Sequence, residues 1–360
     1  MGAAQRGSSG RAVSAAAAAA LALAACTGGS DQAVQTPGPA ASTAEFSEPE
    51  TLATGLQAPW SIAFLAGTPL VSERDSGRIL ELDGAGSHRE VGMIDAQGRG
   101  EGGLLGIAVQ GGYLYSYLTA GNENRIERRE LTGSPGSLAL GGPEVVLSGI
   151  PAGPVHNGGR IAFGPDGMLY ATAGDAGNRD SAQDTGSLSG KILRLMPGGG
   201  VPEDNPFPGS PVYSYGHRNP QGIAWDSEGT LYASEFGQAT WDELNVIEAG
   251  GNYGWPDAEG IADQAGFIDP VQQWEPAAAS PSGIAVLGKM LFIANLRGER
   301  LREVPLEAPG SAIEHLAGEG RLRDAVAAPD GSLWVLTGNT DGRGTPGAED
   351  DRILRLELLP

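Results

Sequence analysis

One short pattern recurs six times along the chain and restricts the possible folds more than any other feature of the sequence. In each copy a turn containing glycine is followed by a short apolar or β-branched run, marked by Leu70, Leu114, Leu169, Leu231, Leu291 and Leu333. Successive marker leucines lie 42 to 62 residues apart, and about 40–60 residues is the length of one four-stranded β-propeller blade. An irregular β-sandwich array could show such runs by chance, but six copies of one two-strand unit disfavour it.

The strands of each blade can be assigned from the runs around the turn. Short runs rich in alanine precede the turns, at 62–64, 107–109, 161–163, 223–225, 284–286 and 325–327. Small side chains suit the centre where blades converge, so we expect these runs to form the innermost strands. Alternating apolar and charged residues at 78–82, 191–195 and 352–356 predict half-buried third strands. The sequence therefore predicts an all-β, six-bladed β-propeller over residues 47–360, with functional residues in the loops of one face.

Composition agrees with one β-rich domain and limits the partners. The 58 glycines and 25 prolines divide the chain into short elements, and 40% apolar residues suffice for a core. A formal net charge of -21 repels phosphate backbones, so we expect no binding to nucleic acid. The acidic surplus suits binding of hard cations, although an acidic surface that keeps an exported protein soluble explains it more simply.

The N-terminal segment predicts export. Residues 1–26 contain Arg6 and Arg11 and then an apolar stretch at 12–25 that is too short to span a bilayer. The chain has a single cysteine, Cys26, which excludes an internal disulfide and a cysteine-cluster metal site. It ends the sequence Leu-Ala-Ala-Cys, which resembles a bacterial lipobox; an ordinary signal peptide with a chance cysteine is the alternative.

We therefore expect an exported lipoprotein on the extracytoplasmic side of the cell membrane, attached through its N-terminal lipid alone. Residues 27–46 consist mostly of Ser, Thr, Gly, Pro, Ala and Gln, a composition that predicts a flexible linker.

Two glycine-flanked loops carry candidate catalytic residues. His156 lies in the sequence His-Asn-Gly-Gly-Arg, directly before the third inner strand. A histidine can act as a general base near neutral pH, although a structural hydrogen-bonding role is the common alternative. Arg218 and Asn219 lie in the loop 215–222, before the fourth inner strand. The Arg218 guanidinium could bind a carboxylate or carbonyl of a ligand, or it could simply hold its loop together.

Further polar clusters indicate an anionic ligand and a cation. Arg297, Arg321 and Arg323 each lie next to a predicted strand, and the last two should point to the same side of an extended segment. Converging arginines in an acidic protein imply an anion, whereas singly each would be read as a surface ion pair. Acidic residues and glycine carbonyls within 234–256 are a weak indication of calcium. The sequence Gly-x-Gly-x-x-Gly at 98–103 lacks a surrounding β-α-β unit, so dinucleotide binding is not expected.

From residue 56 to residue 354 the chain resembles the soluble pyrroloquinoline quinone (PQQ)-dependent glucose dehydrogenases, and more closely the periplasmic aldose sugar dehydrogenases of the glucose/sorbosone dehydrogenase family. The matching motifs occur in order and at blade-sized intervals. They lie at 56–60, 102–106, 156–167, 190–194, 215–222, 242–245 and 252–256. The family fold is a six-bladed propeller, in agreement with the repeats.

The resemblance implies oxidation of aldoses at the anomeric carbon, with PQQ and Ca²⁺ as cofactors and an external electron acceptor. His156 matches the general base, and Arg218 matches the arginine beside the reacting quinone carbonyl. The implied PQQ-binding residues are Glu101, Arg218, Asn219, Asn295, Leu296, Arg297, Arg321, Leu322 and Arg323. The carbonyls of Gly237 and Gln238 match ligands of the calcium that holds PQQ, and Glu243 with the Tyr253 carbonyl matches a second, structural calcium site.

Two departures from the family pattern keep other functions open. Glu101 stands where the family usually has glutamine, and Val155 stands where the glucose enzymes have an acidic residue. A non-catalytic cell-surface propeller that binds glycans or proteins is therefore the second hypothesis. A hydrolase on a related calcium propeller is the third, although hydrolysis does not need the arginine clusters. The sequence is compatible with a monomer or a homodimer.

Overall fold

The computed structural model describes residues 44–359, so the expected signal peptide, the lipobox cysteine and most of the expected linker lie outside the described residues. The described part consists of strands with one short 3-10 helix, Arg179–Ala182. No helix in residues 44–359 is both long and apolar enough to cross a membrane.

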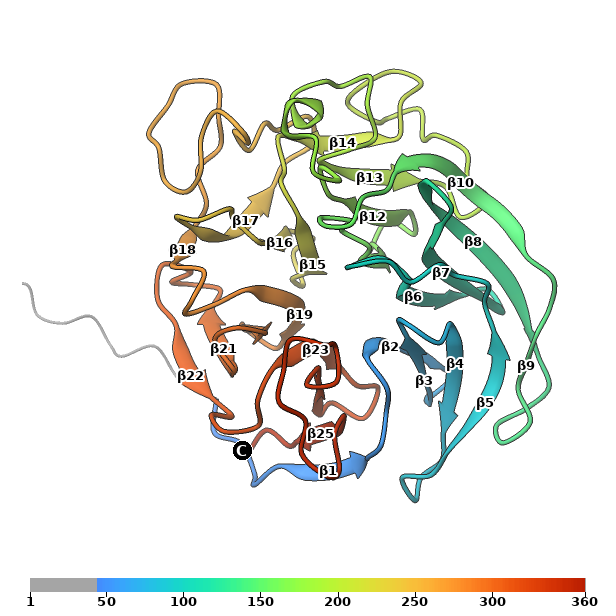
Figure 1. Cartoon of the computed structure of the whole chain (residues 1–360). Helices are drawn as coiled ribbons and strands as arrows, with labels where there is room; N and C mark the ends of the chain where they lie inside the picture. The colour runs from blue at the N-terminus through green and yellow to red at the C-terminus, as the bar shows by residue number, and fades with distance from the viewer. Residues whose placement is uncertain (1–43, 360) are drawn as a thin grey trace, which may run out of the picture. The chain divides into compact units, whose positions relative to one another are not determined.

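Six antiparallel sheets follow one another around a central axis, and Figure 1 shows them as the blades of a ring. The fold is therefore the predicted all-β, six-bladed propeller. The first three blades are β2 (Pro59–Leu65), β3 (Thr68–Glu73), β4 (Arg78–Leu82) and β5 (His88–Met93); β6 (Leu104–Gln110), β7 (Tyr113–Ala120), β8 (Glu123–Thr132) and β10 (Glu144–Pro151), with β9 (Ala139–Leu140) beside β8; and β11 (Ile161–Phe163), β12 (Leu169–Ala173), β13 (Lys191–Leu195) and β14 (Val212–Tyr215).

The remaining blades are β15 (Pro220–Trp225), β16 (Leu231–Glu235), β17 (Asp242–Ile247) and β18 (Gln272–Trp274); β19 (Pro281–Leu287), β20 (Met290–Asn295), β21 (Arg300–Pro305) and β22 (Ile313–His315); and β23 (Leu322–Ala327), β24 (Leu333–Thr337), β25 (Ile353–Leu356) and β1 (Glu50–Ala53). Each of the six alanine-containing runs lies in the innermost strand of its blade, and each marker leucine lies in the second strand.

The first strand of the described residues closes the ring, which the sequence did not predict. β1 is the outer strand of the sixth blade, where Glu50 pairs with Arg355 and Thr51 with Leu354 in the ladder with β25. Residues before β1 also contact the propeller. Phe46, which the sequence placed at the end of the linker, packs edge-on against Phe292 at 5.4 Å. The two ends of the folded region are therefore held together by main-chain hydrogen bonds.

The hydrophobic core lies between successive blades. Leu105 and Tyr117 of the second blade belong to one buried cluster with Ile161 and Leu193 of the third. On the innermost strands Ala325 is completely buried, whereas Ala162 and Ala224 are half-buried. Burial of apolar area between blades is the main stabilising contribution in such a fold.

An arginine spans the centre of the ring. The Arg160 guanidinium donates to Asp324 Oδ2 at 2.8 Å, to Ser61 Oγ at 3.1 Å and to the Gln221 carbonyl at 3.1 Å. It also lies 4.2 Å from the ring of Trp60. Arg160 comes from the start of the third blade, while its partners come from the sixth, first and fourth blades. The polar centre of the propeller therefore joins blades that are far apart in the sequence.

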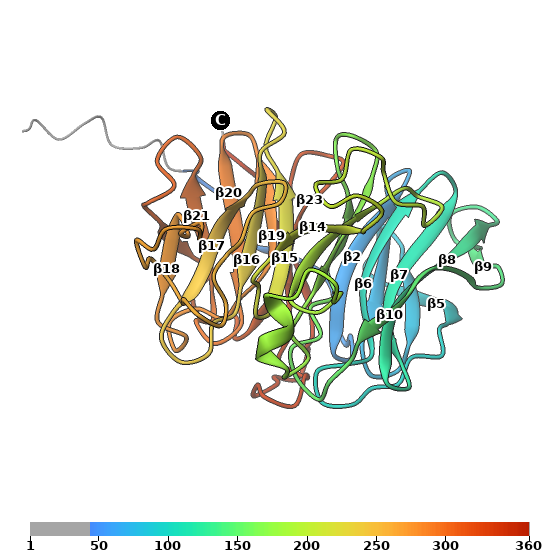
Figure 2. The ribbon, with the colours of Figure 1, turned by 90° about the horizontal axis from the view of Figure 1, so that it is seen from above.

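Two of the long connections lie at one face of the propeller. In Figure 2 the 3-10 helix of the β12–β13 connection and the red β24–β25 connection lie at the same lower edge of the ring. These connections, together with those that enter the innermost strands, carry the candidate functional residues.

Candidate active site

A small pocket lies at the axis, and every blade contributes to its wall. Its lining residues are Trp60, Arg74, Glu101, Asn157, Gly158, Gln221, Phe236, Leu296, Arg323 and Arg343. Glu101, Leu296 and Arg323 are residues that the sequence singled out. Because the wall combines arginines with an aromatic and an apolar side chain, the pocket suits a flat anionic ligand.

His156 lies next to this pocket in a strained main-chain conformation. It precedes Asn157 and Gly158 of the pocket wall and is half-buried, with a φ angle of 57°. Its Nδ1 lies 2.7 Å from Oδ1 of Asp175, a buried residue just after β12. The other carboxylate oxygen of Asp175 accepts a hydrogen bond from Trp255 Nε1 at 2.9 Å.

The Asp175 carboxylate determines that Nδ1 of the His156 ring carries a proton. Burial alone would raise the pKa of Asp175, but hydrogen bonds from His156 and the Gly177 N–H hold that pKa below its ordinary value. An ionised carboxylate can only accept, so His156 Nδ1 carries a proton and donates it to Asp175. In the neutral imidazole the Nε2 atom then keeps its lone pair and can take a proton from a ligand.

Lys191 holds the connection that carries Asp175. Its buried ammonium donates to the carbonyls of Ser181, Ala182 and Ser189, at 2.9, 2.9 and 2.5 Å. At Gly174 an added Cβ would lie 2.1 Å from the His156 carbonyl oxygen, so this close approach requires glycine. The local sequence therefore folds the β12–β13 connection against the histidine loop.

Arg321, directly before β23, and Arg323, within it, converge on one carboxylate. Asp341 Oδ2 lies 2.9 Å from Arg321 Nη2 and 3.5 Å from Arg323 Nη2, so the two side chains share a side as expected. Burial lowers the pKa of Arg323 to about 10; Asp341 opposes this shift, and Arg74, Arg321 and Arg160 add to it. One carboxylate facing several buried guanidinium groups leaves a positive region that attracts anionic ligands.

Glu235 organises the loop that carries Arg218 and Asn219. Its buried carboxylate lies 2.8 Å from His217 Nδ1 and accepts the main-chain N–H groups of both Arg218 and Asn219. Arg218 Nη1 donates to the Phe236 carbonyl at 3.1 Å, and the guanidinium lies 5.5 Å from the ring of Trp255. Arg218 Nε and Asn219 Nδ2 are buried donors without a hydrogen-bond partner among the described residues. Such donors are costly unless a ligand accepts from them.

A second small pocket beside Arg218 is strongly acidic. Glu235, Glu243 and Glu259 line it together with Gly237 and Tyr253. Burial and the Glu235 carboxylate raise the pKa of Glu243 to about 8. This pocket therefore holds three carboxylates against one guanidinium group, that of Arg218.

The expected calcium ligands of this region are mainly main-chain oxygens. Gln238 is exposed, and its N–H donates to Glu259 Oε1 at 2.7 Å. That oxygen also accepts from the N–H groups of residues 239, 240 and 241. Within residues 44–359, no group of three or more His, Cys, Asp or Glu side chains is arranged as a metal site.

Asn295, Arg297 and Leu322 are predicted cofactor residues that do not line the central pocket. Arg297 is exposed to solvent. The Asn295 amide donates to the carbonyls of Ile293 and Arg300 and accepts from Arg302, so all these hydrogen bonds lie within the fifth blade. Leu322 is buried in the hydrophobic cluster of the fifth and sixth blades.

Three residues of the site were missed by the sequence reasoning: Asp175, Asp341 and Arg343. Glu235 belongs to the acidic segment 234–256 but was given no role of its own. The sequence contains a weak signal for Asp175, because an aspartate between glycines directly after a predicted strand is a candidate for a functional loop. The glycines at 98–103, rejected as a dinucleotide motif, have a packing role. An added Cβ at Gly100 would lie 2.1 Å from the Pro154 carbonyl oxygen, directly beside the histidine loop.

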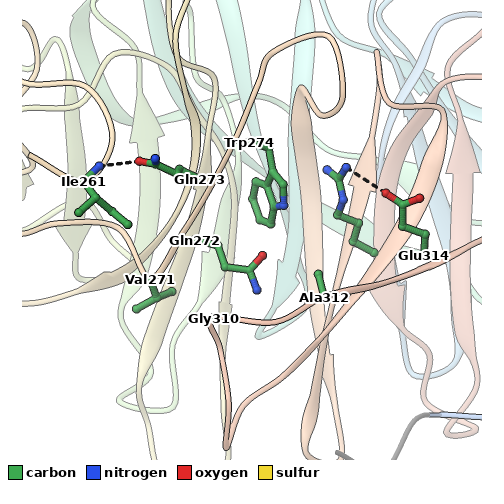
Figure 3. Close-up of a pocket in the computed structure, with 9 residues that line it drawn as sticks. Ile261, Val271, Gln272, Gln273, Trp274, Gly310, Ala312 and Glu314 are labelled. Atoms are coloured by element: carbon green, nitrogen blue, oxygen red, sulfur yellow. Dashed lines mark hydrogen bonds and ion pairs between the residues drawn. The ribbon is translucent and has the colours of Figure 1, made fainter.

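A cleft at the outer edge of the fourth and fifth blades is a poorer candidate. It is lined by Trp274, Arg302 and Glu314 among others (Figure 3). Arg302 is buried, pairs with Glu314 Oε1 at 3.2 Å and lies 5.0 Å from the ring of Trp274. Its charge is therefore already compensated, and no histidine lines the cleft.

Fold and site together define a class of protein: a six-bladed propeller with a histidine–carboxylate pair beside a basic pocket on its axis. The chain belongs to the glucose/sorbosone dehydrogenase family, whose family model, described as Glucose / Sorbosone dehydrogenase, matches residues 56–354. The resemblance carried by the motifs is therefore confirmed.

Individual relatives agree with this assignment. The structure of the PQQ-bound aldose sugar dehydrogenase from Streptomyces coelicolor is 50% identical, covers 88% of this chain and 99% of its own, and has a TM-score of 0.85. The aldose sugar dehydrogenase of Escherichia coli is 30% identical over 80% of each chain. Quinoprotein glucose dehydrogenase B of Acinetobacter calcoaceticus is 34% identical over 55% of this chain and 49% of its own.

Proposed function

We propose that the protein is a PQQ- and calcium-dependent dehydrogenase that oxidises aldose sugars at the anomeric carbon to lactones. The observation that carries this proposal is the His156–Asp175 pair, 2.7 Å apart, beside an arginine-lined pocket on the propeller axis. A proton acceptor next to a site for a flat polyanion is the arrangement that a quinone-dependent sugar oxidation needs. Family membership and the PQQ-bound relative at 50% identity support the same function.

The residues in and beside the central pocket fit PQQ, which carries three carboxylates. Arg321 and Arg323 lie close enough to share the Asp341 carboxylate, so they could share a carboxylate of the cofactor in the same way. The unpartnered donors Arg218 Nε and Asn219 Nδ2 suit an electron-rich acceptor. The wall also supplies the Trp60 and Phe236 rings, which suit a flat heterocycle.

The acidic pocket brings the predicted calcium ligands together. Gly237, Glu243 and Tyr253, which are expected to supply two carbonyl oxygens and one carboxylate, line it with Glu235 and Glu259. Ca²⁺ prefers such oxygen ligands. A bound dication would also remove the mutual repulsion that raises the pKa of Glu243.

In the proposed reaction the chain supplies the proton chemistry. His156 Nε2 takes the proton of the anomeric hydroxyl, and Asp175 stabilises the imidazolium that forms. PQQ, when bound, supplies a quinone that accepts the hydride from the anomeric carbon. The Arg218 guanidinium stabilises negative charge that develops at the pocket, and its burial makes that stabilisation stronger than in water. An external acceptor then reoxidises the enzyme.

Reconstitution of the purified protein tests this function. PQQ is titrated in the presence of Ca²⁺ and followed by absorbance, and a panel of aldoses is then supplied with an artificial electron acceptor. We expect stoichiometric PQQ binding and bleaching of the acceptor with at least one aldose. Binding of PQQ without oxidation of any sugar would refute the substrate, and a folded protein that binds no PQQ would favour a non-catalytic propeller.

We also propose that the enzyme acts outside the cytoplasm, anchored through Cys26. The support is the short apolar segment at 12–25 that ends in the lipobox-like sequence. Mass spectrometry of the mature N-terminus should find a lipid-modified cysteine at position 26, and Cys26→Ala should release the protein from membranes. An unmodified N-terminus upstream of residue 26 would exclude the anchor.

A further inference from the structure

The main chain of His156 needs support because its conformation is rarely adopted by a residue with a side chain. Its φ of 57° lies in the left-handed region. Three hydrogen bonds hold it there. Asp175 binds the ring, the Ala176 N–H donates to the His156 carbonyl at 3.1 Å, and the His156 N–H donates to Glu101 Oε2 at 2.8 Å.

Glu101 locks its own segment to the histidine loop through two bonds in opposite directions. Its side chain accepts the His156 N–H, and its main-chain N–H donates to the Pro154 carbonyl at 2.9 Å. The two segments come from the connections before β6 and before β11. Glu101 therefore fixes the histidine loop of the third blade to the second blade.

The second oxygen of Glu101 is held by the sixth blade. Arg343 Nη2 lies 2.9 Å from Glu101 Oε1, although the two residues are 242 positions apart in the sequence. Arg343 follows Asp341 in the same turn. Asp341 binds Arg321 and Arg323 through its carboxylate, and its carbonyl accepts from Arg74 at 3.2 Å. One turn of the β24–β25 connection thus contacts both the arginine cluster and the carboxylate that supports His156.

We propose that Glu101 and Arg343 form a positioning pair that holds the main chain of His156 in the conformation needed for proton transfer and links it to the arginine end of the pocket. The effect on catalysis rests on the proposed sugar dehydrogenase function. The effect on the histidine loop does not, because it follows from contacts within the chain.

Other roles for the pair fit the contacts less well. Both carboxylate oxygens of Glu101 are already engaged, so neither is free to act as a second base. Although burial alone would raise the pKa of Glu101, the His156 N–H and Arg343 lower it below the ordinary value, and the group stays ionised. A structural ion pair is also a poor explanation, because the Arg343 side chain is 53% exposed and exposed pairs contribute little to stability.

Hydrogen exchange of the cofactor-free protein tests the positioning role without any catalysis. The amide of His156 is followed in peptides that span residues 153–158, in the wild type, in Glu101→Ala, in Glu101→Gln and in Arg343→Gln. We expect Glu101→Ala to accelerate exchange in these peptides at least about tenfold, since the amide loses its acceptor. Glu101→Gln keeps an acceptor oxygen and should stay within about threefold of the wild type.

A matched control is the ion pair of Arg352 with Glu319, 2.9 Å apart, which joins the connection before β23 to the start of β25. Glu319→Ala removes a carboxylate of similar exposure that does not contact the histidine loop, so exchange in 153–158 should not change. If Glu101→Ala folds but leaves this exchange unchanged, the proposal is wrong. If Glu101→Ala does not fold, Arg343→Gln decides: faster exchange in 153–158 supports the pair, and unchanged exchange refutes it.

Kinetics of the PQQ- and Ca²⁺-loaded enzyme test the catalytic consequence. Glu101→Ala should lower kcat at saturating PQQ about 10- to 100-fold, because small misplacements of a catalytic group cost that much. Glu101→Gln should restore kcat to within a few-fold. An unchanged kcat in Glu101→Ala would overturn the role in catalysis. A wild type that oxidises no aldose would refute the proposed function instead and leave the exchange result standing.

Discussion

His156 Nδ1 and Asp175 Oδ1 lie 2.7 Å apart, and they come from two different connections of the third blade. The other oxygen of Asp175 is held by the Trp255 indole at 2.9 Å, from the connection that follows β17 in the fourth blade. This arrangement leaves Asp175 one oxygen for the histidine and fixes which ring nitrogen is free for substrate.

The Asp175→Asn variant tests that arrangement. Trp255 Nε1 donates to one carboxylate oxygen and the Gly177 N–H donates to the other, so the asparagine NH₂ group faces a donor in either orientation. With the NH₂ group toward His156, the imidazole would carry its proton on Nε2 and could not accept one from the sugar; in the other orientation, the neutral amide would no longer stabilise the imidazolium. We expect kcat to fall about 10²- to 10⁴-fold with PQQ affinity nearly unchanged, as measured by steady-state kinetics and absorbance titration. A kcat within threefold of the wild type would contradict the assigned tautomer.

The His156→Gln variant tests the base itself. Glutamine keeps a polar side chain of similar size but cannot take up a proton, so kcat should fall about 10²- to 10⁴-fold. Because the arginines and Asn219 remain, the PQQ titration should be almost unaffected. His315→Gln is a suitable control, since His315 pairs with Glu303 in the fifth blade, away from the pocket. Equal losses in the two variants would argue against a catalytic role for His156.

The Arg160→Met variant tests how the centre of the ring is held together. This change leaves the buried Asp324 carboxylate without its partner. Removing one partner of a buried ion pair lowers the free energy of unfolding by about 3–5 kcal/mol. Arg355→Met removes rim ion pairs to Glu50, Asp330 and Glu357 and should cost less than about 1 kcal/mol. Urea unfolding measures both values. Similar decreases in the free energy of unfolding of the two variants would show that the Arg160–Asp324 pair stabilises the fold no more than the rim ion pairs do.

The acidic pocket should make the calcium-free protein sensitive to pH. The pKa of Glu243 is raised from 4.5 to about 8 in the folded state, chiefly by burial and then by Glu235. Between these values the folded state keeps a proton that the unfolded state has released, so the free energy of unfolding falls as pH rises. The slope is at most about 1.4 kcal/mol per pH unit.

This pH effect is measured by thermal unfolding in a calcium chelator at pH 5, 6.5 and 8, for the wild type and Glu243→Gln. The wild type should lose more stability than the variant across this window, and added Ca²⁺ should stabilise the wild type more at pH 8 than at pH 5. Parallel pH profiles for the two proteins, with or without Ca²⁺, would exclude Glu243 as the source.

The repeats made the fold predictable because they are local signals. A glycine turn with apolar runs on either side specifies two paired strands whatever the rest of the chain does, and six copies specify the ring. The third strand 78–82 coincides with β4 for the same reason. The loops with His156 and Arg218 were also recognisable, since polar residues between glycines and directly before a strand lie at the propeller face.

The side-chain contacts between those loops were not predictable from the spacing of residues in the sequence. Sequence reasoning placed Asn295 and Leu322 in the cofactor site with Leu296 and Arg323, yet the Asn295 side chain bonds within its own blade and Leu322 lies in the core. Neighbours on a strand point in alternate directions, and which of them faces the axis depends on the twist and register of the blade.

The sequence by itself determined the number of blades, the strands that line the axis and the loops that bear polar residues, because hydrophobic periodicity and turn chemistry act over a few residues. Only the tertiary structure decided the long-range pairs: Glu50 with Arg355, 305 positions apart, Arg160 with Asp324, 164 apart, and Glu101 with Arg343, 242 apart. The physical reason is closure of the ring, which brings the first and last blades together and turns loops from all six toward one axis.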